Sequence, residues 1–267
     1  MPAIALLGAT GKMGRAVVRA AAERRDARIC AAVASNRSTH LGADVGLLAG
    51  AAALGVNITA DLGALKGADV AIDFALAADM EGRARAVTSA GCAWVLGTTG
   101  LSPRQLETVR AAAGQVAVLH SPNMSVAVQL LLRLVAEAAR ALPRDYDIEI
   151  FEAHHREKID APSGTARLLG EVAAAARDTR LSESAEFHRA SVGGPRKQDS
   201  IGFSVARGGD IVGEHRVTFA GLGEQLLIEH RATDRMAFAR GAVTAALWLA
   251  GRPRGLYEMS DVISEKQ

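Results

Sequence analysis

Residues 3–14 read AIALLGATGKMG, and this stretch decides the fold. The wholly apolar run AIALL is typical of a buried strand, and a helical pattern follows the glycine turn and continues to about Arg25. Between them stand Gly8, Gly11 and Gly14. In dinucleotide-binding βαβ units, glycines at this point permit a tight turn, let the backbone approach a pyrophosphate, and let helix and strand pack closely. The free N–H groups at the start of the helix then face the anion.

The spacing of these glycines is GxxGxxG, a variant of the dinucleotide fingerprint GxGxxG. The turn is not a Walker A loop, because Lys12 is followed by Met13 rather than by serine or threonine. A glycine-rich turn that binds no ligand is the alternative. The place of the turn between a strand and a helix favours nucleotide binding.

The first half of the chain alternates apolar runs with helical patterns. Strand–helix–strand units of this length are typical of a parallel sheet with helices on both faces. We therefore expect residues 1–125 to form a doubly wound, Rossmann-like α/β domain that binds a dinucleotide. After the first unit, strands are expected at 28–34, 70–74, 93–96 and 116–120, and helices at 77–89 and 102–113.

The pattern changes after about residue 125, and a second domain is expected at 126–234. Consecutive strands with short glycine-containing turns suggest an α+β domain with a mainly antiparallel or mixed sheet. The loop at 191–200 is a candidate for a mobile segment. Strands are expected at 146–152, 201–207, 211–219 and 225–231, and helices at 126–141, from a cap at Ser163 to about Asp178, and at 236–249.

Composition and charge restrict the partners of the chain. Its 267 residues are 49% hydrophobic and 22% charged, as in a globular protein with a substantial core. The net charge is only +2, and the sequence contains no block of like charge, so nucleic-acid binding is not expected. The N-terminus lacks the features of a signal peptide, and the most apolar stretch, from Ser125, is interrupted by Gln129 and Arg133. We expect a cytoplasmic protein without a membrane partner.

The end of the second expected strand bears on the choice of cofactor. NAD-binding sites usually carry an acidic residue there, which holds the ribose hydroxyls. Here the sequence reads AVASNRST, with Ser35, Asn36 and Arg37 in place of an acid. An arginine and hydroxyls accept the extra phosphate of NADP, which a carboxylate would repel. Ser35 and Arg37 therefore predict that NADPH is preferred and NADH is the second donor; a solvated Arg37 is the alternative.

A second stretch with chemical potential is EAHHREKIDAPSGTA at 152–166. A metal site is disfavoured, because His154 and His155 are adjacent on an extended chain and point to opposite sides. Neither an HExxH motif nor a cysteine partner accompanies them. A solvated charged loop is the other alternative.

The position of the cluster argues against an idle loop, since it follows a strand and precedes a helix start. Pro162 and Ser163 are favourable residues for entering a helix. Gly164 and Thr165 would place backbone N–H groups beside basic side chains, a combination that suits a carboxylate. A lysine or histidine there could also supply a proton.

The stretch at 152–166 resembles the signature of the 4-hydroxy-tetrahydrodipicolinate reductases, also called dihydrodipicolinate reductases. The resemblance covers nearly the whole chain. It implies an oxidoreductase that passes a hydride from NADPH or NADH to a cyclic dicarboxylate on the diaminopimelate route to lysine. The other matching motifs are GATGKMG at 8–14, DFA at 73–75, GTTG at 97–100, SPNMSVAVQLL from 121, GDIVGEH from 209, and ALWLAGRPRGLY at 246–257.

The resemblance also implies roles for individual residues. His154 and Lys158 would be the catalytic pair, with Lys158 as the proton donor, while Arg156 would orient the loop. The substrate-binding residues would be His155, Ser163, Gly164 and Thr165. The residues lining the cofactor would be Gly8, Ala9, Thr10, Gly11, Lys12, Met13, Gly97, Thr98, Thr99, Ser121, Pro122, Asn123 and Met124.

Members of this family form homotetramers through the C-terminal sheet, and their last segment returns to the nucleotide domain. By resemblance, residues 126–234 would bind substrate and hold the oligomer together, and 235–267 would join the first domain. Arg235 would either close on the substrate or form an interdomain ion pair. The chain departs from many relatives at Ala34 and Ser35, where they carry an acid.

Two other classes of protein share the opening motif. Short-chain dehydrogenase-like reductases also begin with GATGxxG, but they need a Tyr-x-x-x-Lys pair. Here Tyr146 and Tyr257 are followed four residues later by Ile150 and Asp261. A non-enzymatic NADP-sensing regulator is the second rival, and it has no need of the cluster at 154–158.

Overall fold

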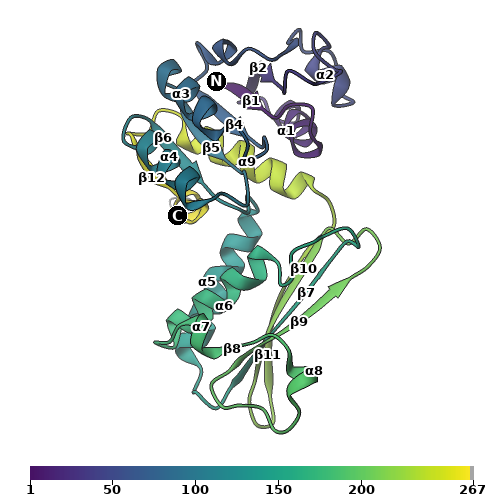
Figure 1. The fold of residues 1–267 in the computed structure, drawn as a ribbon, viewed down its shortest axis with the longest axis vertical. Helices are drawn as coiled ribbons and strands as arrows, with labels where there is room; N and C mark the ends of the chain where they lie inside the picture. Colours follow the sequence, from purple (N-terminus) through teal and green to yellow (C-terminus); the bar gives the residue numbers. More distant parts are fainter. Residues whose placement is uncertain (265–267) are drawn as a thin grey trace. The chain divides into compact units, whose positions relative to one another are not determined.

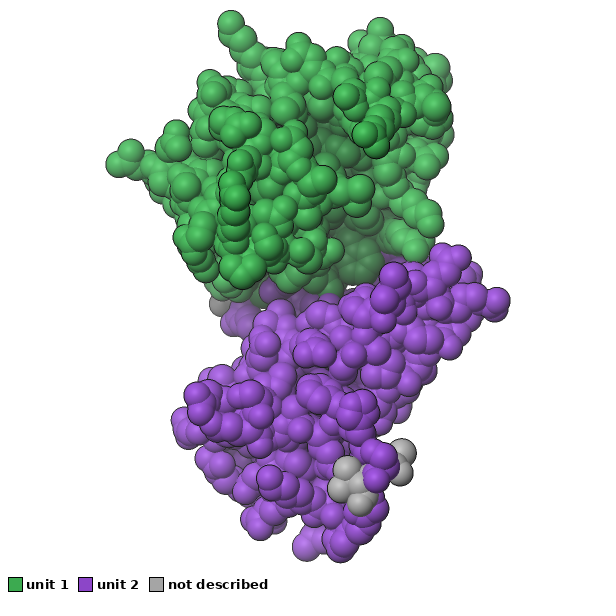
Figure 2. Space-filling view, viewed as in Figure 1, with its two compact units in different colours: residues 1–126, 235–267 green, residues 127–234 purple. Residues whose placement is uncertain are grey.

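A seven-stranded parallel sheet organises the first of the two units into which the chain divides (Figure 1, Figure 2). The computed structural model describes residues 1–264. Unit 1 comprises Met1–Val126 and the chain from Arg235 onward, and unit 2 comprises Ala127–Asp234. The strands of unit 1 lie in the order β12 (Gly255–Tyr257), β6 (Ala117–His120), β5 (Ala93–Leu96), β4 (Val70–Asp73), β1 (Ala3–Leu7), β2 (Arg28–Val33) and β3 (Ile58–Thr59).

Helices cover both faces of this sheet, which explains why all five residues of β1 are buried (Figure 1). Ile4 and Leu6 pack into the core on one face, and Ala5 and Leu7 into the core on the other. The first core includes α1 (Lys12–Ala22), α9 (Met236–Leu249) and α10 (Met259–Ser264), and the second includes α3 (Met80–Ala90) and α4 (Pro103–Ala113). Two short helices, α2 (Val45–Leu48) and η1 (Leu62–Leu65), flank the edge strand β3 in the sequence.

Local capping sets several helix boundaries. Helix α4 begins with a capping box, in which Ser102 and Gln105 bond each other's backbone N–H groups, and Pro103 occupies the first turn. The helix expected from residue 77 begins instead at Met80, because Asp79 takes a left-handed conformation with φ at 55°. The doubly wound parallel sheet expected from the sequence is confirmed.

Unit 2 is built on a five-stranded mixed sheet. Its order is β11 (Gln225–Ala232), β10 (Gly213–Ala220), β7 (Asp147–His154), β9 (Ile201–Arg207) and β8 (Ala185–Glu186). Strands β7 and β10, and β10 and β11, pair antiparallel, whereas β7 and β9, and β8 and β9, pair parallel. The expected α+β domain with a mixed sheet is therefore confirmed.

Two helices cover one face of the sheet of unit 2. Apolar residues of α5 (Val126–Ala141) and α6 (Gly164–Ala176) share one core with Ile148, Ile150, Val217 and Phe219. The side chains of β7 and β10 alternate between buried and partly exposed, as expected of a sheet covered on one face. The short helices α7 (Leu181–Ser184) and α8 (Arg189–Val192) precede β9. Across residues 1–264, every helix is too short or too polar to cross a membrane.

Candidate functional site

The glycine turn after β1 has the geometry of an anion cradle. Gly8 has a φ of +78°, and a Cβ atom there would lie 2.8 Å from the backbone nitrogen of Ala75. A Cβ atom at Gly14 would lie 2.3 Å from the carbonyl oxygen of Gly8, so only glycine lets α1 pack this close to the turn. Gly11 is the N-cap of α1 and has no side chain to bond the first N–H groups. The turn therefore fits the pyrophosphate of a dinucleotide.

The other residues predicted to bind cofactor follow strands of the same sheet. Residues 97–99 follow β5, residues 121–124 follow β6, and Ser35 and Arg37 follow β2. Because these strands are parallel, their carboxyl ends meet at one edge, where open α/β sheets bind ligands. The structure thus brings the whole predicted set to one edge of unit 1.

Internal contacts hold two of these segments. The Thr98 hydroxyl donates to the carbonyl of Ala75 at 2.9 Å, and the Ser121 hydroxyl donates to the carbonyl of Asn123 at 2.8 Å. A Cβ atom at Gly241 of α9 would lie 1.8 Å from the carbonyl oxygen of Met124. The last long helix therefore packs directly on the backbone of the 121–124 segment.

The end of β2 offers a cation but no free carboxylate. Arg37 is exposed, and its backbone N–H donates to the Ser35 hydroxyl at 3.3 Å. The first acidic residue after β2 is Asp44, whose Oδ1 accepts from the amide of Gly46 at 2.8 Å and whose Oδ2 accepts from the amide of Gly55 at 2.7 Å. Asp44 thus caps α2 and organises its loop, which removes it as a partner for ribose hydroxyls.

The basic cluster of unit 2 starts on β7 and continues into the following loop. Strand β7 extends through His154, two residues beyond the end expected from the sequence, because His154 still pairs with Arg207 on β9. The Nδ1 of His154 lies 2.6 Å from Oε2 of the buried Glu152. His155 is half-buried in the loop, and the Nζ of Lys158 lies 2.8 Å from Oδ1 of Asp160. Within residues 1–264, no three His, Cys, Asp or Glu side chains are grouped to ligate a metal.

The start of α6 is fixed by Ser163. The Ser163 hydroxyl accepts from the amide of Ala166 at 3.2 Å, and the Ser163 amide donates to Oε1 of Glu152 at 3.0 Å. Ser163 is buried, so it caps the helix from within, as its sequence context predicted. Gly164 is exposed, and the space where a side chain would stand there is open. The accessible part of the turn therefore begins at Gly164, followed by the half-buried Thr165.

Buried His215 on β10 lies against both parts of the cluster. Its ring meets the ring of His154 edge to face at 5.2 Å between centroids, and its Nε2 lies 3.1 Å from the Ser163 hydroxyl. Burial lowers the pKa of His215 to about 3, although the charge of the nearby Glu152 acts in the opposite direction. The structure therefore places His154 and Ser163 against one neutral, buried imidazole.

The two halves of the chain match two family models. Residues 2–124 match the model described as dihydrodipicolinate reductase, N-terminus, and residues 127–263 match the C-terminus of the same family. The chain belongs to the dihydrodipicolinate reductase family. The resemblance seen in the sequence is thereby confirmed.

Relatives within the family are similar over nearly their whole length. A 4-hydroxy-tetrahydrodipicolinate reductase of Nitrosomonas europaea is 46% identical over 97% of each chain. One of Alkalilimnicola ehrlichii is 48% identical over 97% of this chain and 98% of that one. A solved dipicolinate-bound dihydrodipicolinate reductase from Paenisporosarcina sp. TG-14 covers 97% of each chain with a TM-score of 0.74 and 22% identity, and it supports the fold.

Three residues near the cluster were not predicted to take part: Glu152, Arg207 and His215. Glu152 stands two residues before His154, so strand alternation places both side chains on one face, a signal that was available in the sequence. Arg207 and His215 come from β9 and β10 and become neighbours only through strand pairing. His215 closes the motif GDIVGEH, but that match to the reductase family gave it no role, and Arg207 lies outside the matching motifs.

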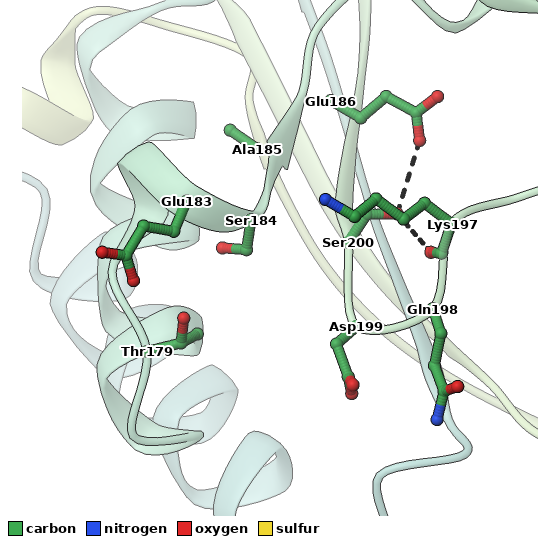
Figure 3. A pocket seen from close by; sticks show the side chains of 9 residues that line it. All are labelled: Thr179, Glu183, Ser184, Ala185, Glu186, Lys197, Gln198, Asp199 and Ser200. Atoms are coloured by element: carbon green, nitrogen blue, oxygen red, sulfur yellow. Dashed lines mark hydrogen bonds between the residues drawn. The ribbon is translucent and has the colours of Figure 1, made fainter.

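Unit 2 also has a hollow that is separate from the basic cluster (Figure 3). It lies at the end of the sheet opposite to His154. Its lining includes β8, whose partner is the start of β9, whereas His154 pairs with the last residue of β9. The Ser200 hydroxyl bonds Glu186 and the carbonyl of Lys197 there (Figure 3). The hollow therefore contains none of the predicted site residues. Its lining residues are Thr179, Glu183, Ser184, Ala185, Glu186, Lys197, Gln198, Asp199 and Ser200.

The loop at 191–200, considered as a mobile segment, is anchored near its middle by Arg196. The Arg196 guanidinium pairs with Asp147 at 2.8 Å and Glu149 at 3.0 Å. It also donates to the carbonyl of Ile148 at 3.0 Å. These bonds tie residue 196 to the first half of β7, so this part of the loop has a defined position.

Proposed function

We propose that this chain reduces 4-hydroxy-tetrahydrodipicolinate to tetrahydrodipicolinate, with NADPH or NADH as the hydride donor, on the diaminopimelate route to lysine. The observation that carries this proposal is the basic cluster from His154 to Lys158, beside the start of α6, in a chain that matches the reductase family over both units. The test is oxidation of NADPH when the purified chain receives the condensation product of pyruvate and aspartate semialdehyde. An NADP-sensing regulator would bind NADPH but leave it reduced.

His154 and Lys158 serve proton transfer in this proposal. Hydride addition to an unsaturated imine leaves electron density on the substrate, which a nearby proton must quench. An ammonium group can donate a proton, and the ion pair of Lys158 with Asp160 holds its ammonium group in place. Lys158 is therefore assigned as the proton donor, and His154 as its catalytic partner.

The substrate carboxylates are held by the half-buried His155 and the first turn of α6. Gly164 and Thr165 stand at the N-terminus of a 13-residue helix, where the partial positive charge of the helix favours an anion. Ser163 shapes this turn through its cap rather than by an exposed hydroxyl. A small-molecule dicarboxylate is thus the partner that the cluster suits.

The cofactor lies at the carboxyl edge of the sheet of unit 1 in this proposal. When bound, a reduced nicotinamide supplies the hydride. Residues 8–13 receive the pyrophosphate at the glycine turn. The segments at 97–99 and 121–124 line the remainder, held by Thr98 and Ser121 through the bonds described above.

NADPH is the preferred donor in this proposal, because Arg37 is exposed at the end of β2 and Asp44 is committed to its own loop. Replacing Arg37 by alanine should raise KM for NADPH by about tenfold, since a charge-assisted bond to phosphate is lost. KM for NADH should change little. Steady-state kinetics with both donors measures the effect, and Arg28→Ala, an exposed arginine at the opposite end of β2, is the matched control. A wild-type preference for NADH would contradict the assignment.

A homotetramer formed through the sheet of unit 2 is also proposed. The edge strand β11 exposes Leu226 and Leu227, which are 42% and 49% accessible, and an apolar edge of this kind invites pairing with another copy. Light scattering should give four times the chain mass. Leu227→Lys should reduce the mass, while Leu130→Lys, on an exposed face of α5, should not. A monomeric wild-type chain would contradict the proposal.

A further inference from the structure

Glu152 is an acidic residue without exposed surface, and it stands at the centre of the catalytic cluster. Both of its oxygens are occupied by groups from three different segments. Oε2 accepts from Arg207 at 2.8 Å and lies 2.6 Å from Nδ1 of His154, while Oε1 accepts from Arg207 at 2.7 Å and from the Ser163 amide at 3.0 Å. A buried carboxylate is tolerated only with partners of this kind.

These bonds decide the ionisation of Glu152. Burial opposes the charged form, but the hydrogen bonds from His154, Arg207 and the Ser163 amide together lower the pKa of this carboxyl to about 2. An ionised carboxylate can only accept hydrogen bonds. His154 must therefore donate its Nδ1–H to Glu152, which leaves Nε2 as the nitrogen that can exchange a proton with another group.

Other contacts hold the ring of His154 in one orientation. A Cβ atom at Gly213 would lie 3.1 Å from Nε2 of His154, so the missing side chain on β10 makes room for the ring. His215 packs against the ring edge to face, and Arg207 bonds both oxygens of Glu152 and the carbonyl of Asp160 at 2.6 Å. The titratable groups in contact with the His154 ring are thus Glu152 and His215, and Arg207 pairs with Glu152 from β9. In the following loop, Lys158 pairs with Asp160.

We infer that Glu152, held by Arg207, is a positioning residue that fixes the tautomer and orientation of His154 and ties the start of α6 to the same carboxylate. This inference rests on the proposed function, in which His154 serves proton transfer and α6 holds the substrate. One carboxylate then sets both the proton-transferring nitrogen and the position of the anion-binding turn. Arg207 acts through Glu152 by keeping it charged and oriented.

Glu152→Gln tests the inference, because glutamine keeps the size of the side chain and removes the charge. We expect kcat to fall roughly 10- to 100-fold, the usual loss when an orienting partner is removed, with KM for NADPH unchanged. Nitrogen-15 spectra of histidine-labelled protein, assigned with His154→Asn, should show His154 protonated at Nδ1 in the wild type and a shift toward Nε2–H in the variant. Glu149→Gln is the matched control, since Glu149 lies on the same strand, pairs with Arg196 and points to the other face.

A second variant keeps the inference testable if Glu152→Gln alone does not fold. Removing one partner of a buried ion pair leaves the other charge uncompensated, so Glu152→Gln combined with Arg207→Met removes both charges and should show the same tautomer change. An unchanged tautomer in either folded variant would overturn the inference, whatever happens to kcat. A changed tautomer with a normal kcat would support the positioning of His154 by Glu152. It would also show that His154 does not take part in the proposed proton transfer.

Discussion

Replacing Lys158 by alanine should lower kcat by about 10²-fold or more, the usual scale of general acid catalysis. The side chain is 22% exposed and its ammonium group is held 2.8 Å from Asp160, so it is both fixed and reachable. KM for NADPH should change little, because Lys158 belongs to unit 2 and the residues assigned to the cofactor belong to unit 1. Steady-state kinetics with varied NADPH and saturating substrate separates the two effects.

Lys197→Ala is the control for this experiment. Lys197 lies in the same unit but lines the hollow at the other end of the sheet, so its loss should leave kcat unchanged. A near-normal kcat in Lys158→Ala would remove Lys158 from the role of proton donor. The fold and the cofactor assignment would stand in that case.

Replacing Gly8 by alanine should weaken NADPH binding at least tenfold and lower the free energy of unfolding by about 2–4 kcal/mol. Two costs add at this position. The φ of +78° is unfavourable for alanine, and the new Cβ would meet the backbone of Ala75 at 2.8 Å. Since that backbone cannot yield easily, the turn that receives the pyrophosphate must move. Fluorescence titration with NADPH and urea denaturation measure the two effects.

Gly67→Ala separates these two costs. Gly67 has a φ of +84° in the same unit, but nothing lies within 4 Å of the position of its missing Cβ. The Gly67→Ala variant should lose only about 1 kcal/mol of its free energy of unfolding and should bind NADPH normally. Equal effects of the two substitutions would show that backbone conformation alone, rather than close packing at the cradle, makes Gly8 necessary.

Much of the fold could be predicted from local sequence patterns, because local interactions determine the longer strands and the helix starts. The apolar run before Gly8 forms a buried strand, and the Pro-Ser-Gly entry to α6 places a cap at Ser163, as expected. The short strands β3, β8 and β12 escaped prediction, since two or three residues carry no periodic signal. They exist through pairing with longer neighbours, which depends on the whole sheet.

The interior of the candidate site could not be obtained from the sequence in the same way. The cluster at 152–166 is visible in the sequence as a run of titratable residues. However, the residue that keeps the Glu152 carboxylate ionised and oriented is Arg207, 55 positions away. His215 likewise reaches Ser163 from 52 positions away. Such contacts depend on the parallel pairing of β7 with β9 and the antiparallel pairing of β7 with β10, which no local spacing encodes.

The central claim is that this chain transfers a hydride to the cyclic product of pyruvate and aspartate semialdehyde. The most direct measurement supplies that product, freshly formed, together with NADPH and follows the loss of the near-ultraviolet absorbance of the reduced nicotinamide. We predict rapid oxidation that depends on both the product and the chain and falls about 10²-fold or more with Lys158→Ala. NADPH that binds to the chain but stays reduced in the presence of that product would contradict the claim.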